Sequence, residues 1–168
     1  DEPQAMELAV GLLADRGCRR VGSIIYGQSG TGNTEIRKNG ILKALKRHGL
    51  PVAEQLIRFS TEDGYVEEIG RLLQNGVDAL FCPGGNAGMV AAYALSLYNR
   101  RVPADISLIA SERTVFSRYA TPPQTTISQN YAAQASAVAD ALDACLSGQP
   151  FPRRTVIPYQ LILRDSVR

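Results

Sequence analysis

The loop from Gly27 to Thr34 is rich in glycine and hydroxyl side chains and leads into an expected helix. Backbone N–H groups at the start of a helix favour bound anions, so the loop has anion-binding chemistry. It lacks the Gly-Lys-Ser/Thr ending of a nucleotide-hydrolysing phosphate loop, and the sequence therefore does not predict nucleotide hydrolysis. Asn33, inside this loop, is a candidate contact for a polar ligand.

Arg37 and Glu112 are the charged candidates for ligand binding. Arg37 lies one turn into the helix after the loop, where its planar fork could bind hydroxyls or a carboxylate bidentately. Glu112 comes soon after an expected strand, residues 106–110, and offers acceptor oxygens. A solvated surface arginine and a solvated loop carboxylate are the alternatives. Ligands bind at the carboxyl ends of parallel strands, so both side chains should face one cleft there.

Gly84, Gly85 and Asn86 follow another expected strand. Two glycines allow close approach to the backbone, so Asn86 or backbone N–H groups could supply polar contacts to a ligand. His48 is the only histidine and lies at a basic helix end, with no serine or cysteine nucleophile motif. The sequence therefore predicts a binding protein, not an enzyme, without a cofactor or metal ion.

The composition is that of an ordinary globular protein. The 168 residues are 45% hydrophobic and 20% charged, enough for one domain, or for one domain plus a segment of another. A net charge of +2 is too small to indicate nucleic-acid binding by this chain. Three cysteines without metal-ligand spacing indicate reduced thiols, with Cys82 and Cys145 expected in the core. Without an apolar run of spanning length or a signal peptide, no membrane association and a cytoplasmic location are expected.

Apolar runs alternate with helical stretches along the chain. Strands are expected at residues 21–26, 56–59, 80–82 and 106–110, and helices at 33–48, 61–74 and 87–98. This alternation predicts an α/β fold with a doubly wound, Rossmann-like parallel sheet and crossover helices. After the Pro122-Pro123 turn, a short extended run at Ile127 precedes an alanine-rich helix, 131–146, and a final strand, 155–163.

Four segments carry a resemblance to a known family: Arg37–Gly40, Val102–Ser107, Pro122–Gln129 and Arg164–Ser166. They resemble the effector-binding half of the lactose-repressor (LacI/GalR) family of bacterial transcription regulators. The resemblance implies a periplasmic-binding-protein-like type I subdomain that senses a sugar or a similar small polar metabolite. It further implies a homodimeric repressor that binds operator DNA only through an N-terminal domain absent from this chain.

The resemblance also implies roles for individual residues. Arg37 matches the family's effector-contacting arginine, and Glu112 stands where the family usually has an aspartate that hydrogen-bonds sugar hydroxyls. Gly84 and Gly85 depart from the family's Asn-Asp, which puts the identity of the ligand in question. The predicted effector-binding set is Asn33, Arg37, Phe59, Gly84, Gly85, Asn86 and Glu112.

On the same resemblance, residues 1–123 form the C-terminal effector-binding subdomain and residues 124–168 contribute to its partner subdomain. The apolar stripe of the helix 131–146 should then be exposed in this chain and drive self-association. Two other classes remain open: a sugar-binding protein of a transport system, with the same fold, and a flavodoxin-like FMN protein, whose phosphate loop Gly27–Thr34 resembles.

Overall fold

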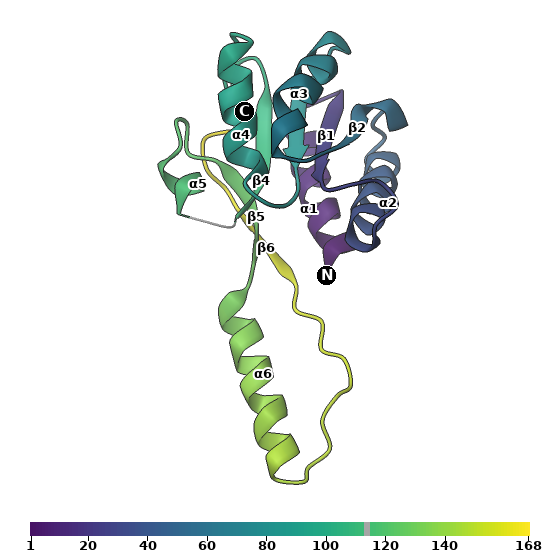
Figure 1. The fold of residues 1–168 in the computed structure, drawn as a ribbon, viewed down its shortest axis with the longest axis vertical. Coiled ribbons are helices and arrows are strands. Elements are labelled where there is room, and N and C mark those ends of the chain that lie inside the picture. The colour runs from purple at the N-terminus through teal and green to yellow at the C-terminus, as the bar shows by residue number, and fades with distance from the viewer. Residues whose placement is uncertain (113–114) are drawn as a thin grey trace.

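Six strands form a single sheet in the order β2-β1-β3-β4-β5-β6 in the computed structural model, which describes residues 1–112 and 115–168 (Figure 1). The strands are β1 (Val21–Tyr26), β2 (Ile57–Ser60), β3 (Ala79–Cys82), β4 (Ser107–Glu112), β5 (Thr125–Gln129) and β6 (Tyr159–Ile162). The first five run parallel, as the sequence pattern predicts, and only β6 is antiparallel to its neighbour. The predicted α/β class and doubly wound sheet are therefore confirmed.

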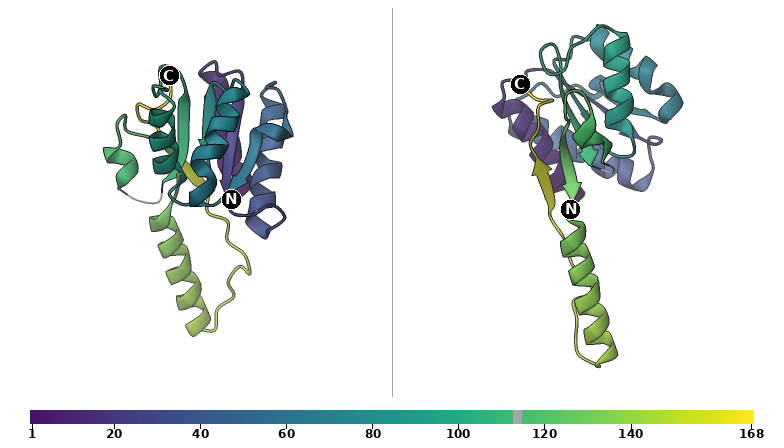
Figure 2. Two further views of the ribbon diagram at one scale, coloured as in Figure 1. Left: turned by 45° about the horizontal axis from the view of Figure 1, so that its top comes forward. Right: turned by 90° about the vertical axis from the view of Figure 1, so that its left-hand side faces the viewer.

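Helices cover both faces of the sheet (Figures 1 and 2). They are α1 (Glu2–Asp15), α2 (Gly32–Arg47), α3 (Tyr65–Gln74), α4 (Ala87–Leu97), the short α5 (Phe116–Tyr119) and α6 (Tyr131–Leu146), with 3-10 turns η1 (Glu54–Leu56) and η2 (Glu62–Gly64). None of the helices in the described ranges is long and apolar enough to cross a membrane.

Alternating side chains of the strands build two separate cores. Ile25 and Phe81 face the layer of α1 and α2, whereas Ile24 and Leu80 face the layer of α3 and α4. Successive side chains of a strand point to opposite faces, and a sheet covered on both sides needs apolar residues at both sets of positions. The near-continuous apolar runs of the central strands follow from this double burial.

A buried serine, Ser166, helps to tie the C-terminal segment into the sheet. Ser166 donates its hydroxyl to the Leu108 carbonyl (2.5 Å) and accepts from the Thr125 amide (2.8 Å). Its own carbonyl accepts from the Leu108 amide at 2.8 Å. The last residues of the chain therefore join β4 to β5 and hold the ends of both strands in place.

The return strand β6 is shorter than the predicted strand 155–163, and it runs antiparallel to β5. Strand β5 leads out of the sheet into α6, which extends away from the sheet beyond its edge (Figures 1 and 2). The chain must then re-enter the sheet from that end, so β6 pairs antiparallel to β5, with Ile127 opposite Leu161.

Helix α6 has no buried residue. Its side chains Val138, Leu142 and Leu146 are 68%, 58% and 80% exposed, a stripe at helical spacing that faces solvent. Cys145 is exposed on the same helix, so the prediction that it lies in the core is wrong, while that for Cys82 is confirmed. The apolar sequence around Cys145 indicated burial, but no helix or strand among residues 1–112 and 115–168 buries a side chain of α6.

Candidate functional site

A polar cavity of about 290 Å³ opens at the carboxyl edge of the sheet. Its walls come from the N-terminus of α1, the first turns of α2, the loop after β3, the end of β4 and the exit of β5. It is lined by Glu2, Tyr26, Asn33, Arg37, Gly84, Gly85, Ser111, Glu112, Ile127, Gln129, Tyr131 and Tyr159. A ligand here would lie where parallel sheets of this kind bind ligands.

Arg37 is held at this cavity by a carboxylate from another helix. Its Nε and Nη2 donate to the two oxygens of Glu2, at 2.8 and 3.2 Å, and the two side chains are 19% and 21% exposed. Burial would raise the pKa of Glu2, but hydrogen bonds from Arg37 and Tyr159 outweigh it and lower that pKa. The hydrogen bond to Glu2 also raises the pKa of Arg37, so both groups are charged and paired.

Glu112 is paired in the same way. Arg164 donates through Nη1 and Nη2 to its two carboxylate oxygens, at 2.9 and 3.2 Å. The Thr126 hydroxyl also donates to this carboxylate. Burial would raise the pKa of Glu112, but these hydrogen bonds outweigh it, so its pKa is lowered and the group stays ionised. A ligand hydroxyl would have to bind the oxygen lone pairs that remain.

Gly84 leaves room for Arg37. A Cβ atom built on Gly84 would lie 2.7 Å from Arg37 Nη1, and Gly84 has a φ of +98° that side-chain-bearing residues rarely adopt. Its amide donates to the Ser111 hydroxyl at 2.9 Å. Gly84 is thus explained by the arginine that lies over it, whereas a Cβ atom on Gly85 would be in ordinary contact with the Tyr26 ring at 3.5 Å, and Gly85 is favoured by its φ of +54°.

A chain of hydrogen bonds crosses the floor of the cavity from β5 to α1. Gln129 Nε2 donates to the Tyr159 hydroxyl at 3.0 Å, and that hydroxyl donates to Glu2 Oε1 at 2.8 Å. Tyr131, at the start of α6, stands at the rim and is exposed. The cavity therefore presents hydroxyl and amide groups whose positions are fixed by other side chains.

In the glycine-rich loop before α2, donors that could bind a ligand anion instead bind a carboxylate of the chain itself, that of Glu35. The Gly30 amide and the Ser29 hydroxyl donate to the Glu35 carboxylate, at 2.9 and 3.3 Å. The Thr31 and Thr34 hydroxyls donate to the Gln28 carbonyl. These donors stabilise the loop internally, which leaves less of its anion-binding capacity for a phosphate group.

Five of the seven predicted site residues line the one cavity: Asn33, Arg37, Gly84, Gly85 and Glu112. Phe59 does not, because its position in β2 directs it into the core under α1 and α2. Asn86 does not either; it is exposed and borders a neighbouring pocket. Residues 113–114, which follow Glu112, lie outside the described residues.

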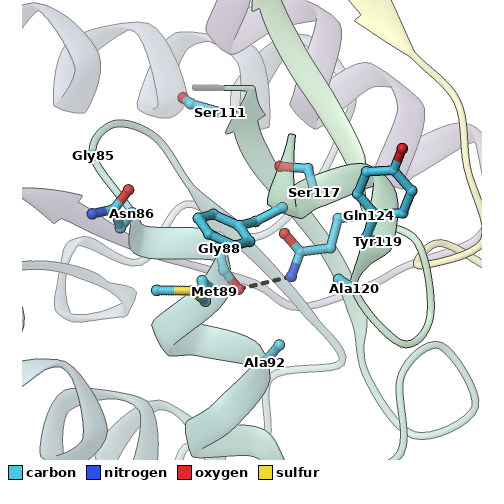
Figure 3. A pocket seen from close by; sticks show the side chains of 11 residues that line it. Gly85, Asn86, Gly88, Met89, Ala92, Ser111, Ser117, Tyr119, Ala120 and Gln124 are labelled. Carbon is cyan, nitrogen blue, oxygen red and sulfur yellow. Dashed lines mark hydrogen bonds between the residues drawn. The ribbon is translucent and has the colours of Figure 1, made fainter. Parts of the chain in front are cut away.

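The neighbouring pocket lies between α4 and α5 (Figure 3) and has a volume of about 170 Å³. Met89, Ala92 and Tyr119 contribute to its walls, and Gln124 Nε2 donates to the Gly88 carbonyl at its floor, at 2.8 Å. Its lining is more apolar than that of the first cavity, so the two sites suit different occupants.

Sequence reasoning missed Glu2, Ser111, Gln129, Tyr131 and Tyr159. Ser111 precedes Glu112 at the end of β4, and Gln129 and Tyr131 lie at and just after the end of β5, so the strand-end rule would have found them had it been applied to the neighbours of Glu112 and to β5. Glu2 and Tyr159 carry no such signal, because they reach the cavity from a helix N-terminus and from the antiparallel return strand.

The described residues offer no group of three or more His, Cys, Asp or Glu side chains that could hold a metal ion. Burial raises the pKa of the Cys82 thiol to about 12, so this thiol is protonated and unreactive at neutral pH. The lining of the cavity offers hydrogen-bond donors and acceptors.

The periplasmic binding protein-like domain family matches residues 10–167, and the chain belongs to this family. Its relatives are transcriptional regulators. The HTH-type transcriptional repressor PurR of Yersinia pestis (strain Pestoides F) is 34% identical over 165 residues, which cover 95% of this chain and 48% of that protein. The chain thus spans about half the length of this relative.

Solved structures share the fold. The Escherichia coli transcriptional repressor AscG matches with a TM-score of 0.88 and 23% identity over 99% of this chain and 62% of that one. A complex of the transcriptional regulator CelR with cellobiose matches with a TM-score of 0.85 and 26% identity over 99% of this chain and 52% of the other. The likeness extends from β1 to the return strand β6, so it includes the antiparallel edge.

Proposed function

We propose that this chain is the effector-sensing part of a LacI-type transcriptional repressor and that its effector is a sugar or a similar small polar metabolite. The polar cavity at the carboxyl edge of the sheet is the observation that carries the proposal, because it combines fixed hydrogen-bonding groups with three tyrosine rings, Tyr26, Tyr131 and Tyr159. Saccharides offer hydroxyl groups together with apolar ring faces and so suit such a lining. The similarity of this chain to the regulator CelR, solved in complex with cellobiose, supports the choice of a sugar as the ligand.

Named residues take separate roles in this proposal. Arg37 directs its guanidinium over Gly84 and donates to ligand hydroxyls, while Asn33 and Gln129 contribute amide groups. Glu112 accepts hydrogen bonds from hydroxyls through the lone pairs that Arg164 leaves unused. Tyr159 connects the two sides of the cavity through its hydrogen bonds.

Control of DNA binding by an effector requires a second subdomain that forms the opposite wall of the cavity. Residues 1–123 would form one subdomain, and residues 124–168, with the exposed helix α6, would belong to a partner subdomain on the open side of the cavity. An effector that contacts both subdomains favours one of their relative orientations, and only a difference in affinity between orientations can change DNA binding. Operator DNA would be bound by a segment outside these 168 residues, in the cytoplasm.

A homodimer would form through the outer face of α4 and the neighbouring α5. Met89, Tyr93 and Leu97 recur at four-residue spacing on α4 and are 50%, 60% and 53% exposed, with Phe116 and Tyr119 beside them on α5. An exposed apolar surface of this kind is typical of a protein interface. The partner proposed for this surface of α4 and α5 is a second copy of the regulator.

Titration of the chain with uncharged mono- and disaccharides, followed by NMR amide shifts, tests the ligand class. We expect at least one saccharide to give saturable shifts centred on Arg37, Ser111 and Gln129. The variant Arg37→Ala should lose them, and the control Arg47→Ala, on the same helix but outside the cavity, should keep them. Shifts centred elsewhere, or equal losses in both variants, would contradict the proposed site.

A further inference from the structure

The ion pair between Glu2 and Arg37 decides the charge of the cavity. Without Glu2, Arg37 would place an unpaired positive charge at the wall. Glu2 contacts it through two hydrogen bonds, and Tyr159 donates a third to the same carboxylate, which holds the pair in position. A bidentate arginine–carboxylate contact fixes both the distance and the orientation of the two groups.

The rest of the lining adds no net charge. Glu112 is the other charged residue among those that line the cavity, and Arg164 binds both of its oxygens. Every charged side chain in the described lining therefore has a partner of opposite charge within hydrogen-bonding distance. The remaining polar groups are hydroxyls and amides of neutral side chains.

A carboxylate or phosphate that enters this cavity meets an arginine whose charge is already neutralised. Two of its N–H groups are occupied by Glu2, and the Glu2 oxygens lie next to the site that a ligand anion would take. Like charges at such distances repel, and the repulsion is strong where little water separates them. An uncharged hydroxyl can accept from Arg37 Nη1 without this repulsion.

We propose that Glu2 is the residue that selects the ligand by charge. By neutralising Arg37 it makes the cavity bind uncharged polyhydroxylated molecules and reject ligands that carry a carboxylate or phosphate. This inference rests on the proposed function, because it names the class of effector that the same cavity takes. The glycine at position 84 belongs to the arrangement, since it leaves the space in which Arg37 reaches Glu2.

The test removes the charge of Glu2 and uses inorganic phosphate as the probe. Phosphate is titrated into the chain and into Glu2→Gln, and amide shifts give the dissociation constants. Glu2→Gln should bind phosphate at least about tenfold more tightly, the change expected when a charged hydrogen-bonding group becomes free. The gain should disappear in the double variant Glu2→Gln, Arg37→Gln.

Glu7→Gln is the matched control, because Glu7 also lies on α1 and pairs with Arg47 and His48 away from the cavity. It should bind phosphate as the unchanged chain does. If Glu2→Gln fails to fold, Glu2→Asn takes its place with the same expectation. Phosphate affinity that Glu2→Gln leaves unchanged, or a gain that persists without Arg37, would overturn the role of Glu2. The proposed function is tested separately, by saccharide binding to the unchanged chain.

Discussion

Replacing Gly84 with alanine would test whether this position is a glycine because of Arg37. Two separate effects follow from the geometry. The φ of +98° strains any residue with a Cβ atom, and the new Cβ would lie 2.7 Å from Arg37 Nη1. The guanidinium would have to move, and its bidentate contact with Glu2 would weaken.

The two effects can be separated by a matched substitution. Gly30 has a φ of +83°, and nothing lies within 4 Å of a Cβ atom built on it, so Gly30→Ala carries the strain alone. Such strain costs about 1–2 kcal/mol. Gly84→Ala should lose roughly 1–2 kcal/mol more in the free energy of unfolding, the range for weakened hydrogen bonds between charged groups that are partly exposed.

Urea unfolding of both variants, in the natural sequence and with Arg37→Ala, measures the difference. We expect Gly84→Ala to be the more destabilising of the two only when Arg37 is present. If both alanine variants cost the same in the natural sequence, or if the excess survives the removal of Arg37, the explanation of Gly84 by the arginine is wrong.

Two further predictions concern pH and assembly. The lowered pKa values of Glu2 and Glu112 contribute stability that is present above about pH 4.3, their unfolded value, and is lost as pH falls through the lower folded values. Urea unfolding from pH about 6 to 3 should therefore show a shallower fall for Glu112→Gln than for the unchanged chain; parallel curves would contradict this. The chain should self-associate at tens of micromolar through the exposed stripe of α6, and sedimentation should show Leu142→Glu less associated than Ser136→Glu, a control off the stripe. A clean monomer of the unchanged chain would refute the second prediction.

The sheet and most of one cavity could be predicted because they depend on local patterns. Apolar runs separated by helical stretches determine the parallel strands, and the carboxyl ends of parallel strands meet at one edge. Arg37, Gly84 and Glu112 therefore lie together although 75 positions of sequence separate the first from the last. The placement of these three residues needed only strand order.

The partners of those side chains could not be predicted in the same way. Glu2 and Tyr159 contact each other across 157 positions of sequence, and their meeting depends on how α1 and the return strand pack. Phe59 belongs to the predicted effector-binding set, but the two-residue alternation of β2 turns its side chain towards the core. The end of a strand places a residue at the edge of the sheet, whereas the alternation of side chains along the strand decides which face its side chain points to.

The most direct measurement of the central claim is the effector response of the longer regulator that would contain this chain. Operator binding is followed by fluorescence anisotropy during titration with the saccharide that binds the chain in the NMR experiment. Arg37→Ala should weaken effector binding by about 1.5–3 kcal/mol, a shift of roughly 10- to 150-fold in the half-maximal effector concentration, with operator affinity unchanged when no effector is present. An effector titration that Arg37→Ala leaves unchanged would contradict the assignment of this cavity as the sensing site.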